Sequence, residues 1–99
     1  MAKIRRFHPL AAADISKAIA YYDDVSIDLG NRFRDSIRQR FESITEFPES
    51  YGKIRDPLRA AMISRFPYVI LFEQVDEAVV ILGVFHAASD CEGWFERKT

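Results

Sequence analysis

The sequence is poor in the features that mark secreted and membrane proteins. It contains a single cysteine, Cys91, which has no second cysteine in the chain with which to form a disulfide bond. A lone thiol is typical of proteins in a reducing compartment. No apolar run approaches the ~20 residues of a membrane-spanning helix. No apolar run of signal-peptide length follows the basic residues at the N-terminus. We therefore expect a cytoplasmic protein with no membrane partner.

The sequence also lacks a charge excess of either sign. Its 14 lysines and arginines nearly balance 15 aspartates and glutamates, which gives a formal net charge of −1. Because clustered cations carry most of the affinity for phosphates, this balance argues against a broad or sequence-specific nucleic-acid-binding surface. The 99 residues, 48% of them hydrophobic, contain no repeat, linker or low-complexity segment. We therefore expect one globular domain, residues 1–99, with a small core.

Two amphipathic helices are predicted in the N-terminal half, after a short strand at 2–7. Pro9 suits the first position of a helix. Apolar residues follow it at steps of three and four: Ala11, Ile15, Ala18, Ile19 and Tyr22. The pattern fails across residues 23–30, where Asp28 can cap a second helix, which is bounded by Pro48. The apolar face of this second helix consists of Leu29, Phe33, Ile37, Phe41 and Ile44. A connection of about five residues predicts an antiparallel helical hairpin.

The C-terminal half changes to the pattern of β-strands. Residues 47–57 hold two prolines and a glycine and are predicted to form a loop. Strands are predicted at 58–66, 68–73 and 78–86, with a turn at 74–77. The second and third of these runs are nearly continuously apolar, as in central strands covered on both faces. The element order is thus β-α-α-β-β-β, an α+β fold in which the helical hairpin packs on one face of a small, mostly antiparallel sheet.

Several segments, in an order that extends over almost the whole chain, carry a family resemblance. They are FHPLAAADISKAIAYY (7–22), GNRFRDSI (30–37), ITEFPESYG (44–52), RFPYVILFE (65–73), VVILGVFH (79–86), Trp94 and Arg97. The chain resembles the RelE/ParE toxin superfamily of bacterial type II toxin–antitoxin, or plasmid stabilisation, modules. The resemblance implies the same β-α-α-β-β-β fold and a small toxin held silent by a bound antitoxin. One branch of the superfamily cleaves mRNA in the ribosome, and another poisons DNA gyrase.

The mRNA-cleaving branch needs groups that activate the 2′-OH, hold the phosphate and protonate the leaving oxygen. The matching positions in this chain are Ala60 and Met62 for two lysines, Val69 and Ser89 for two arginines, and Phe95 for a tyrosine. None keeps the required chemistry, since valine cannot hold a phosphate and phenylalanine has no proton to give. The resemblance therefore implies a ParE-like toxin without catalysis, cofactor or metal, which acts by binding a target such as gyrase.

Two other functions stay open. One is a ribosome-dependent endoribonuclease with rearranged residues, which would use Arg59, Arg65 and His86. The other is a non-toxic binding module that keeps the fold and the antitoxin contact. It is suggested by HAASD at 86–90, where ParE-like toxins usually carry one or two arginines after the strand histidine. A cognate antitoxin is the expected partner. As the target of an active toxin, gyrase is favoured over the ribosome.

The candidate site residues of the C-terminal half are mostly cationic. Arg59 and Arg65 lie six positions apart in the predicted strand 58–66, so alternation would place them on one face. Arg55 lies in the loop before them, and the three form either an anion- or antitoxin-contacting patch or a solvated face. Tyr51 in the same loop is predicted to be exposed and available to a partner. His86 is either a general base or, as we favour, a tether that joins the C-terminal segment to the sheet through a hydrogen bond.

A second basic group lies on the second predicted helix. Arg34 and Arg38 are neighbours at i and i+4, with Arg32 and Arg40 beside them. This group forms either a solvated face or a face that contacts gyrase or another partner. Cys91 lacks the third and fourth ligands of any zinc pattern and is predicted to be a free, partly exposed thiol.

Five aromatic residues are assigned to packing. Trp94 and Phe95 are predicted to plug the C-terminal segment against the sheet. Tyr21, Tyr22 and Phe33 are predicted to lie in the core between the two helices.

Overall fold

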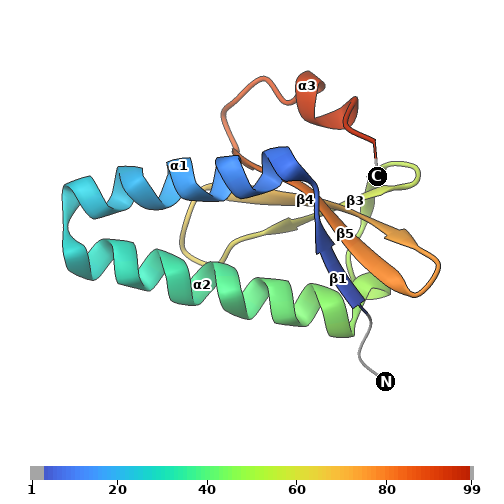
Figure 1. Cartoon of the computed structure of the whole chain (residues 1–99), viewed down its shortest axis with the longest axis horizontal. Coiled ribbons are helices and arrows are strands. Elements are labelled where there is room, and N and C mark those ends of the chain that lie inside the picture. The colour runs from blue at the N-terminus through green and yellow to red at the C-terminus, as the bar shows by residue number, and fades with distance from the viewer. Residues whose placement is uncertain (1–3, 99) are drawn as a thin grey trace.

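The computed structural model describes residues 4–98 and confirms the predicted α+β fold (Figure 1). Its elements are β1 (Ile4–Phe7), α1 (Pro9–Val25), α2 (Ile27–Glu46), the 3-10 turn η1 (Pro48–Ser50), β2 (Lys53–Arg55), β3 (Leu58–Met62), β4 (Tyr68–Val75), β5 (Ala78–His86) and α3 (Glu92–Phe95). Residues 2 and 3 of the first predicted strand lie outside the described residues. No helix within 4–98 is long and apolar enough to span a bilayer.

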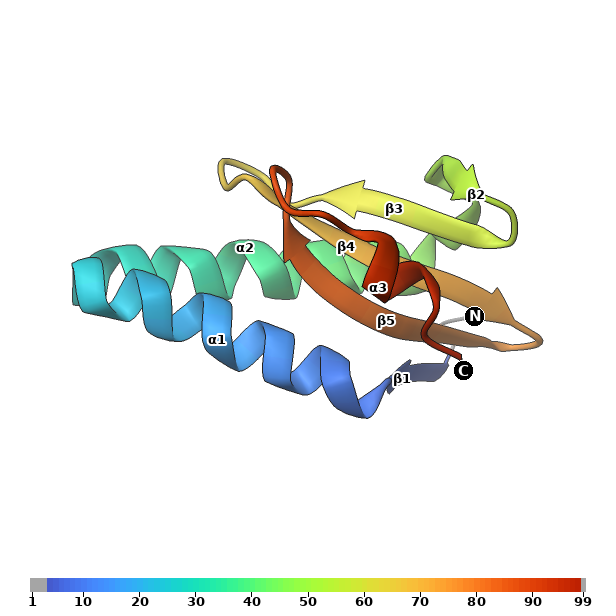
Figure 2. The same ribbon diagram turned by 90° about the horizontal axis from the view of Figure 1, so that it is seen from above.

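One five-stranded sheet organises the molecule, in the order β1-β5-β4-β3-β2. β1 pairs with β5 in parallel, and the other three pairings are antiparallel. The prediction of a mostly antiparallel sheet is therefore confirmed. The helices α1 and α2 lie together on one face of the sheet, and the C-terminal segment with α3 crosses the other (Figure 2). β5 and β4 are central strands, which explains why their sequences are apolar nearly throughout.

The helical hairpin is tighter than predicted. α1 and α2 are separated by Ser26 alone, because its extended backbone turns the chain between them. Ser26 is also the N-cap of α2, since its hydroxyl accepts a hydrogen bond from the N–H of Leu29 at 3.0 Å. The assignment of the cap to Asp28 is therefore wrong; this residue lies in the first turn and pairs with Arg32 at 3.0 Å. A carboxylate there still favours the helix through the macrodipole.

The strands differ from prediction at their ends. β3 stops at Met62 rather than at residue 66, because the chain turns at 63–67, where Arg65 has a φ of 70°. β4 continues two residues beyond the predicted end, to Val75, and β5 has the predicted bounds. β2 lies inside the predicted loop 47–57, so that prediction is wrong for residues 53–55. Three residues are too few to show the alternation that marks a strand.

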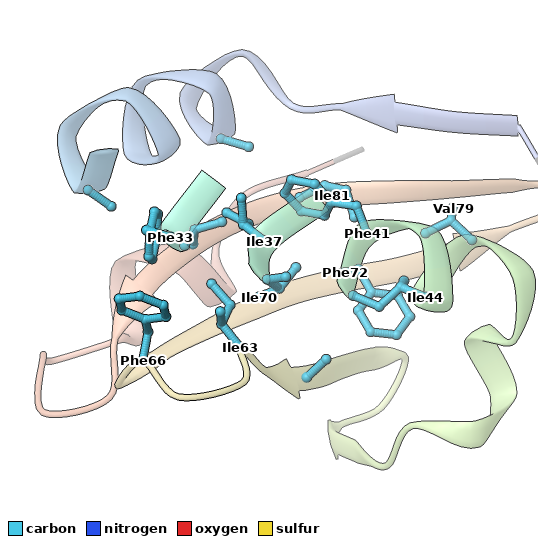
Figure 3. Close-up of a cluster of buried hydrophobic side chains, with 14 of the residues drawn as sticks. Phe33, Ile37, Phe41, Ile44, Ile63, Phe66, Ile70, Phe72, Val79 and Ile81 are labelled. Carbon is cyan, nitrogen blue, oxygen red and sulfur yellow. The ribbon is translucent and has the colours of Figure 1, made fainter. Parts of the chain in front are cut away.

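The main core lies between the helical hairpin and the sheet (Figure 3). It contains the apolar faces of both helices and one face of β3, β4 and β5. The labelled side chains are Phe33, Ile37, Phe41, Ile44, Ile63, Phe66, Ile70, Phe72, Val79 and Ile81. Tyr22 joins this core and stacks on Phe33 with 4.9 Å between ring centroids, as predicted. Tyr21 does not, because its side chain is 60% exposed.

Candidate functional site

The C-terminal segment covers the face of the sheet that the helices leave open. Its residues Trp94 and Phe95 pack against a second apolar cluster, formed by Leu58, Leu71, Val80, Leu82 and Phe85. The prediction that these two aromatic residues plug the segment against the sheet is confirmed. Cys91 also contacts this cluster; it is a free, partly exposed thiol, as predicted. The central strands β4 and β5 are therefore covered on both faces, by the helical hairpin and by the C-terminal segment.

Asp14 of α1 is the polar centre of this arrangement. Its Oδ2 accepts hydrogen bonds from Trp94 Nε1 at 2.8 Å, from Arg97 Nη1 at 2.7 Å and from the N–H of Val84 at 3.1 Å. The side chains of Asp14 and Arg97 are only 14% and 13% exposed. Hydrogen bonds between charged groups in such a shielded place are among the stronger ones in proteins. Asp14 thus joins α1, β5 and the C-terminal segment.

The same groups complete an unpaired part of the edge of β5. β1 pairs with β5 only as far as Ile81. Beyond it, Arg97 Nη1 donates to the carbonyl of Leu82 at 2.8 Å, and Asp14 accepts from the N–H of Val84. Buried backbone N–H and C=O groups that have no partner in a neighbouring strand need such hydrogen bonds from side chains.

Gly83 leaves room for the indole. A Cβ at this position would overlap Trp94 Cδ1 and would lie 2.6 Å from Arg97 Nη1. The register of β4 and β5 also shifts beside it, between Leu71 and Phe72. A side chain at 83 would therefore force Trp94 and Arg97 to shift.

Sequence reasoning did not single out Asp14, although the sequence contains a signal for it. Asp14 falls between Ala11, Ile15 and Ala18, inside the apolar stripe of its helix. A carboxylate in an apolar stripe needs charged or hydrogen-bonding partners. The two that it finds, Trp94 and Arg97, are eighty and eighty-three positions away, and nothing local in the sequence identifies them.

His86 lies at the end of β5, but it does not tether the C-terminal segment as predicted. Its Nδ1 accepts a hydrogen bond from the N–H of Ala88 at 3.0 Å, within the turn that follows the strand. Its ring packs edge-on against Tyr68 with centroids 5.3 Å apart. The tether is the Asp14 cluster instead, because a carboxylate accepts several hydrogen bonds at once whereas a neutral imidazole nitrogen accepts one.

The predicted patch of Arg59 and Arg65 is not formed. The two residues share no strand, because β3 ends before Arg65, so the alternation argument fails. Arg59 Nη1 donates to the carbonyl of Tyr51 at 2.6 Å. Arg65 lies exposed in the β3–β4 turn and lines a groove against α2, which also holds Arg32. His86 lines a different cleft, beside α1. Arg59, Arg65 and His86 are therefore not brought together at one site.

Tyr51 and Arg55 both have partners inside the molecule. The Tyr51 ring packs against the main core, and its hydroxyl is 2.6 Å from Ser43 Oγ and 3.1 Å from Arg40 Nη1. The expectation of an exposed, available Tyr51 is therefore wrong. Arg55 stacks its guanidinium over the ring of Phe95, 4.4 Å from the centroid. It thereby holds the C-terminal segment from the β2 side through a cation–π contact.

The arginines of α2 differ in how they are held. Arg34 forms a two-pronged ion pair with Asp23 of α1, at 2.9 and 2.6 Å. The hydrogen bonds that Arg34 donates to Asp23 raise the pKa of the guanidinium above its ordinary value. Gly30 makes this pair possible, because a Cβ there would overlap the Asp23 carboxylate. Arg38 pairs with its neighbour Asp35 on the exposed face.

Four of the five positions that match the ribonuclease residues belong to the face of the sheet that the C-terminal segment covers. Ala60 and Met62 share the face of β3 that carries Leu58, and Val69 of β4 is the register partner of Met62. Val69 and Phe95 both pack against the second apolar cluster. This face of the sheet is thus built for apolar packing.

Comparison with known proteins identifies the family. The family model described as the ParE toxin of the type II toxin–antitoxin system, parDE, matches residues 5–91. A solved structure titled "Chromosomal ParDE TA system from P. aeruginosa" is similar in fold, with a TM-score of 0.73 at 17% sequence identity. The similarity covers 86% of this chain and 96% of that chain. No curated protein matches the sequence. Because the family model spans most of the chain, this protein belongs to the ParE toxin family of type II toxin–antitoxin systems.

Proposed function

We propose that this ParE-family toxin acts by binding a target protein, DNA gyrase, and that a cognate antitoxin neutralises it by binding to it. The observation that carries the proposal is the character of the sheet face opposite the helices. That face is apolar and is occupied by Trp94 and Phe95 of the C-terminal segment. RNA cleavage requires cations and proton donors at such a surface, whereas protein binding does not.

The distribution of the remaining cations supports protein binding as well. Arg34 and Arg59 are engaged by Asp23 and by the carbonyl of Tyr51, so we assign them to internal stability. Arg65 is exposed in the groove beside α2 and forms no ion pair within residues 4–98. We propose Arg65 as the principal cation for contact with a partner.

Arg38 and Arg55 are proposed as secondary partner contacts. Their side chains stay more than half exposed although each has an acidic neighbour in the molecule. Exposed ion pairs are worth little, on the order of 0–1 kcal/mol, so a partner can replace these neighbours at small cost. Arginine is also among the residues most enriched at the centres of protein interfaces.

A supercoiling assay tests the gyrase target. Purified chain is added in micromolar excess to gyrase with relaxed plasmid and ATP. We expect inhibition of supercoiling or accumulation of cleaved plasmid, and weaker inhibition by Arg65→Ala. The matched control is Arg6→Ala, an exposed arginine on β1 outside the groove. Unchanged supercoiling with folded chain would contradict the gyrase assignment.

Bacterial growth tests the toxin and the antitoxin together. The chain is induced alone and then with the open reading frame adjacent to its gene. Arrest that the neighbour relieves is the expected result. Tight binding to the neighbour's product without any effect on growth would identify the chain as a non-toxic binding module rather than an active toxin. Arg59, Arg65 and His86 lie at separate places in the fold, which argues against the rearranged ribonuclease.

A further inference from the structure

A small cleft lies between α1 and the end of β5. Figure 2 shows that α1 runs beside β5. We call the cleft the α1–β5 cleft, and its volume is about 250 Å³. Its walls are formed by Asp14, Lys17, Ala18, Tyr21, Tyr68, Val84, Phe85, His86, Ser89 and Trp94. Organic cofactors and substrates usually occupy clefts of about 300 Å³ or more. The α1–β5 cleft is therefore better matched to a single side chain.

Several polar groups in this cleft can donate hydrogen bonds. Within residues 4–98, the hydroxyls of Tyr21 and Tyr68 donate to no protein atom, and neither does the ammonium of Lys17. Since Nδ1 of His86 accepts from Ala88, the proton of the neutral imidazole is on Nε2, which is then a donor. The lining thus offers donors from α1, β4 and β5 to one small volume.

Tyr68 is held in its neutral, donating form. Burial raises its pKa above the ordinary value for tyrosine, and the nearby Tyr21 raises it further. Tyr21 and Tyr68 both line the cleft. A phenol that stays protonated remains a donor throughout the physiological pH range.

The charge of the cleft is positive once its internal pairs are counted. The carboxylate of Asp14 is neutralised by Arg97 at 2.7 Å and is already occupied by three hydrogen bonds to its Oδ2. Lys17, exposed on α1, has no ion-pair partner within the described residues. The cleft therefore complements an anionic acceptor.

From this geometry we propose that the α1–β5 cleft receives a carboxylate side chain, aspartate or glutamate, of the antitoxin. The carboxylate accepts hydrogen bonds from Tyr21, Tyr68 and His86 and pairs with Lys17. The inference rests on the proposed function, because it supposes that an antitoxin binds. A protein segment is favoured over nucleic acid because the cleft contains one lysine and the whole chain has a net charge of −1. Tyrosine is also among the residues enriched at interface hot spots.

The test measures binding of the full chain to the protein encoded by the adjacent open reading frame, by titration calorimetry. We expect Lys17→Glu to weaken binding by roughly tenfold or more, and Tyr21→Ala by a similar factor. Both residues are exposed on α1, so the variants should fold, and circular dichroism checks this. The matched controls are Val25→Ala, which like Tyr21 is 60% exposed on α1, and Arg6→Glu on β1. The controls should stay within about twofold of the original affinity.

A charge swap identifies the carboxylate. Each acidic residue of the adjacent protein is changed to lysine in turn, and binding to the Lys17→Glu chain is measured. One such partner variant should restore most of the lost affinity, while it weakens binding to the unchanged chain. Failure of every swap to restore affinity would overturn the inference.

The outcomes separate this inference from the proposed function. If the unchanged chain binds the adjacent protein but Lys17→Glu and Tyr21→Ala bind equally well, the carboxylate site is wrong and the antitoxin partnership stands. If the unchanged chain does not bind the adjacent protein at all, the carboxylate site and the antitoxin partnership are both overturned. Strong loss for Lys17→Glu and Tyr21→Ala, with unchanged controls and one restoring swap, establishes the site.

Discussion

Replacement of Asp14 by asparagine tests the central polar cluster most directly. The change keeps the size of the side chain but removes its charge and one of its acceptor oxygens. Arg97, whose side chain is 13% exposed, then loses its ion-pair partner. In addition, if the asparagine oxygen takes the place of Oδ2, its NH2 group faces another donor, Arg97 Nη2, which lies 3.4 Å from Oδ1.

The expected loss of stability follows from this shielding. Removal of one partner from a buried ion pair typically costs about 3–5 kcal/mol, because the other charge stays buried and unpaired. We expect the lower end, about 3 kcal/mol, because both side chains keep some exposure. For a domain of this size each kcal/mol lowers the midpoint of thermal unfolding by about 4–8 °C, so the decrease should exceed about 10 °C.

Urea unfolding followed by tryptophan fluorescence measures this loss of stability with a probe inside the cluster. Trp94 is the only tryptophan in the chain, and it lies in the cluster itself. The matched control is Asp24→Asn, an exposed aspartate on the same helix, which should change the free energy of unfolding by less than about 0.5 kcal/mol.

A double-mutant cycle with Arg97→Met isolates the ion pair. The coupling energy between the two changes should be about 1–3 kcal/mol, because the two side chains are in direct contact. If Asp14→Asn lay within about 0.5 kcal/mol of the original chain, or the coupling were zero, the assignment of Asp14 as the centre of the cluster would be refuted.

Three further predictions concern other parts of the fold. Gly83→Ala should lower the free energy of unfolding by about 1–3 kcal/mol through overpacking against the indole. Gly52→Ala should not, because a Cβ at Gly52 meets no atom within 4 Å. Chemical denaturation of both variants measures the difference. Ser26→Ala should cost about 1 kcal/mol through loss of the helix cap, and thermal unfolding by circular dichroism would contradict this if the midpoint stayed unchanged. Burial raises the pKa values of Tyr22 and Tyr68, so both should ionise above pH ~10 in a spectrophotometric titration. Because their folded pKa values are raised, the stability that they contribute should be complete below pH ~10 and lost above it.

The elements that the sequence predicts well are those whose pattern is local. The steps of three and four through Phe33 and Ile37 mark the buried face of α2, because a helix repeats every 3.6 residues. The run 78–86 is β5 over its full length, because a central strand buried on both faces is apolar without interruption. The element order and the mostly antiparallel sheet follow from these patterns and the loops between them.

The predictions that failed concern places where two local signals compete. Asp28 and Ser26 are both good caps, and the choice depends on where α1 ends, at Val25. Residues 58–66 look like one strand, but the turn at Arg65 ends it early. Tyr51 falls in a loop by composition, yet its ring reaches the core and its hydroxyl reaches α2. Packing between elements decides each case.

The sequence by itself therefore determined the α+β class, the helical faces and the central strands, because each follows from short-range periodicity. Only the tertiary structure decided which polar groups meet. Asp14 finds Trp94 and Arg97 across eighty and more residues, and the α1–β5 cleft gathers donors from three elements. Such contacts arise when the sheet and the helices bring distant backbone segments together, and local propensity does not encode them.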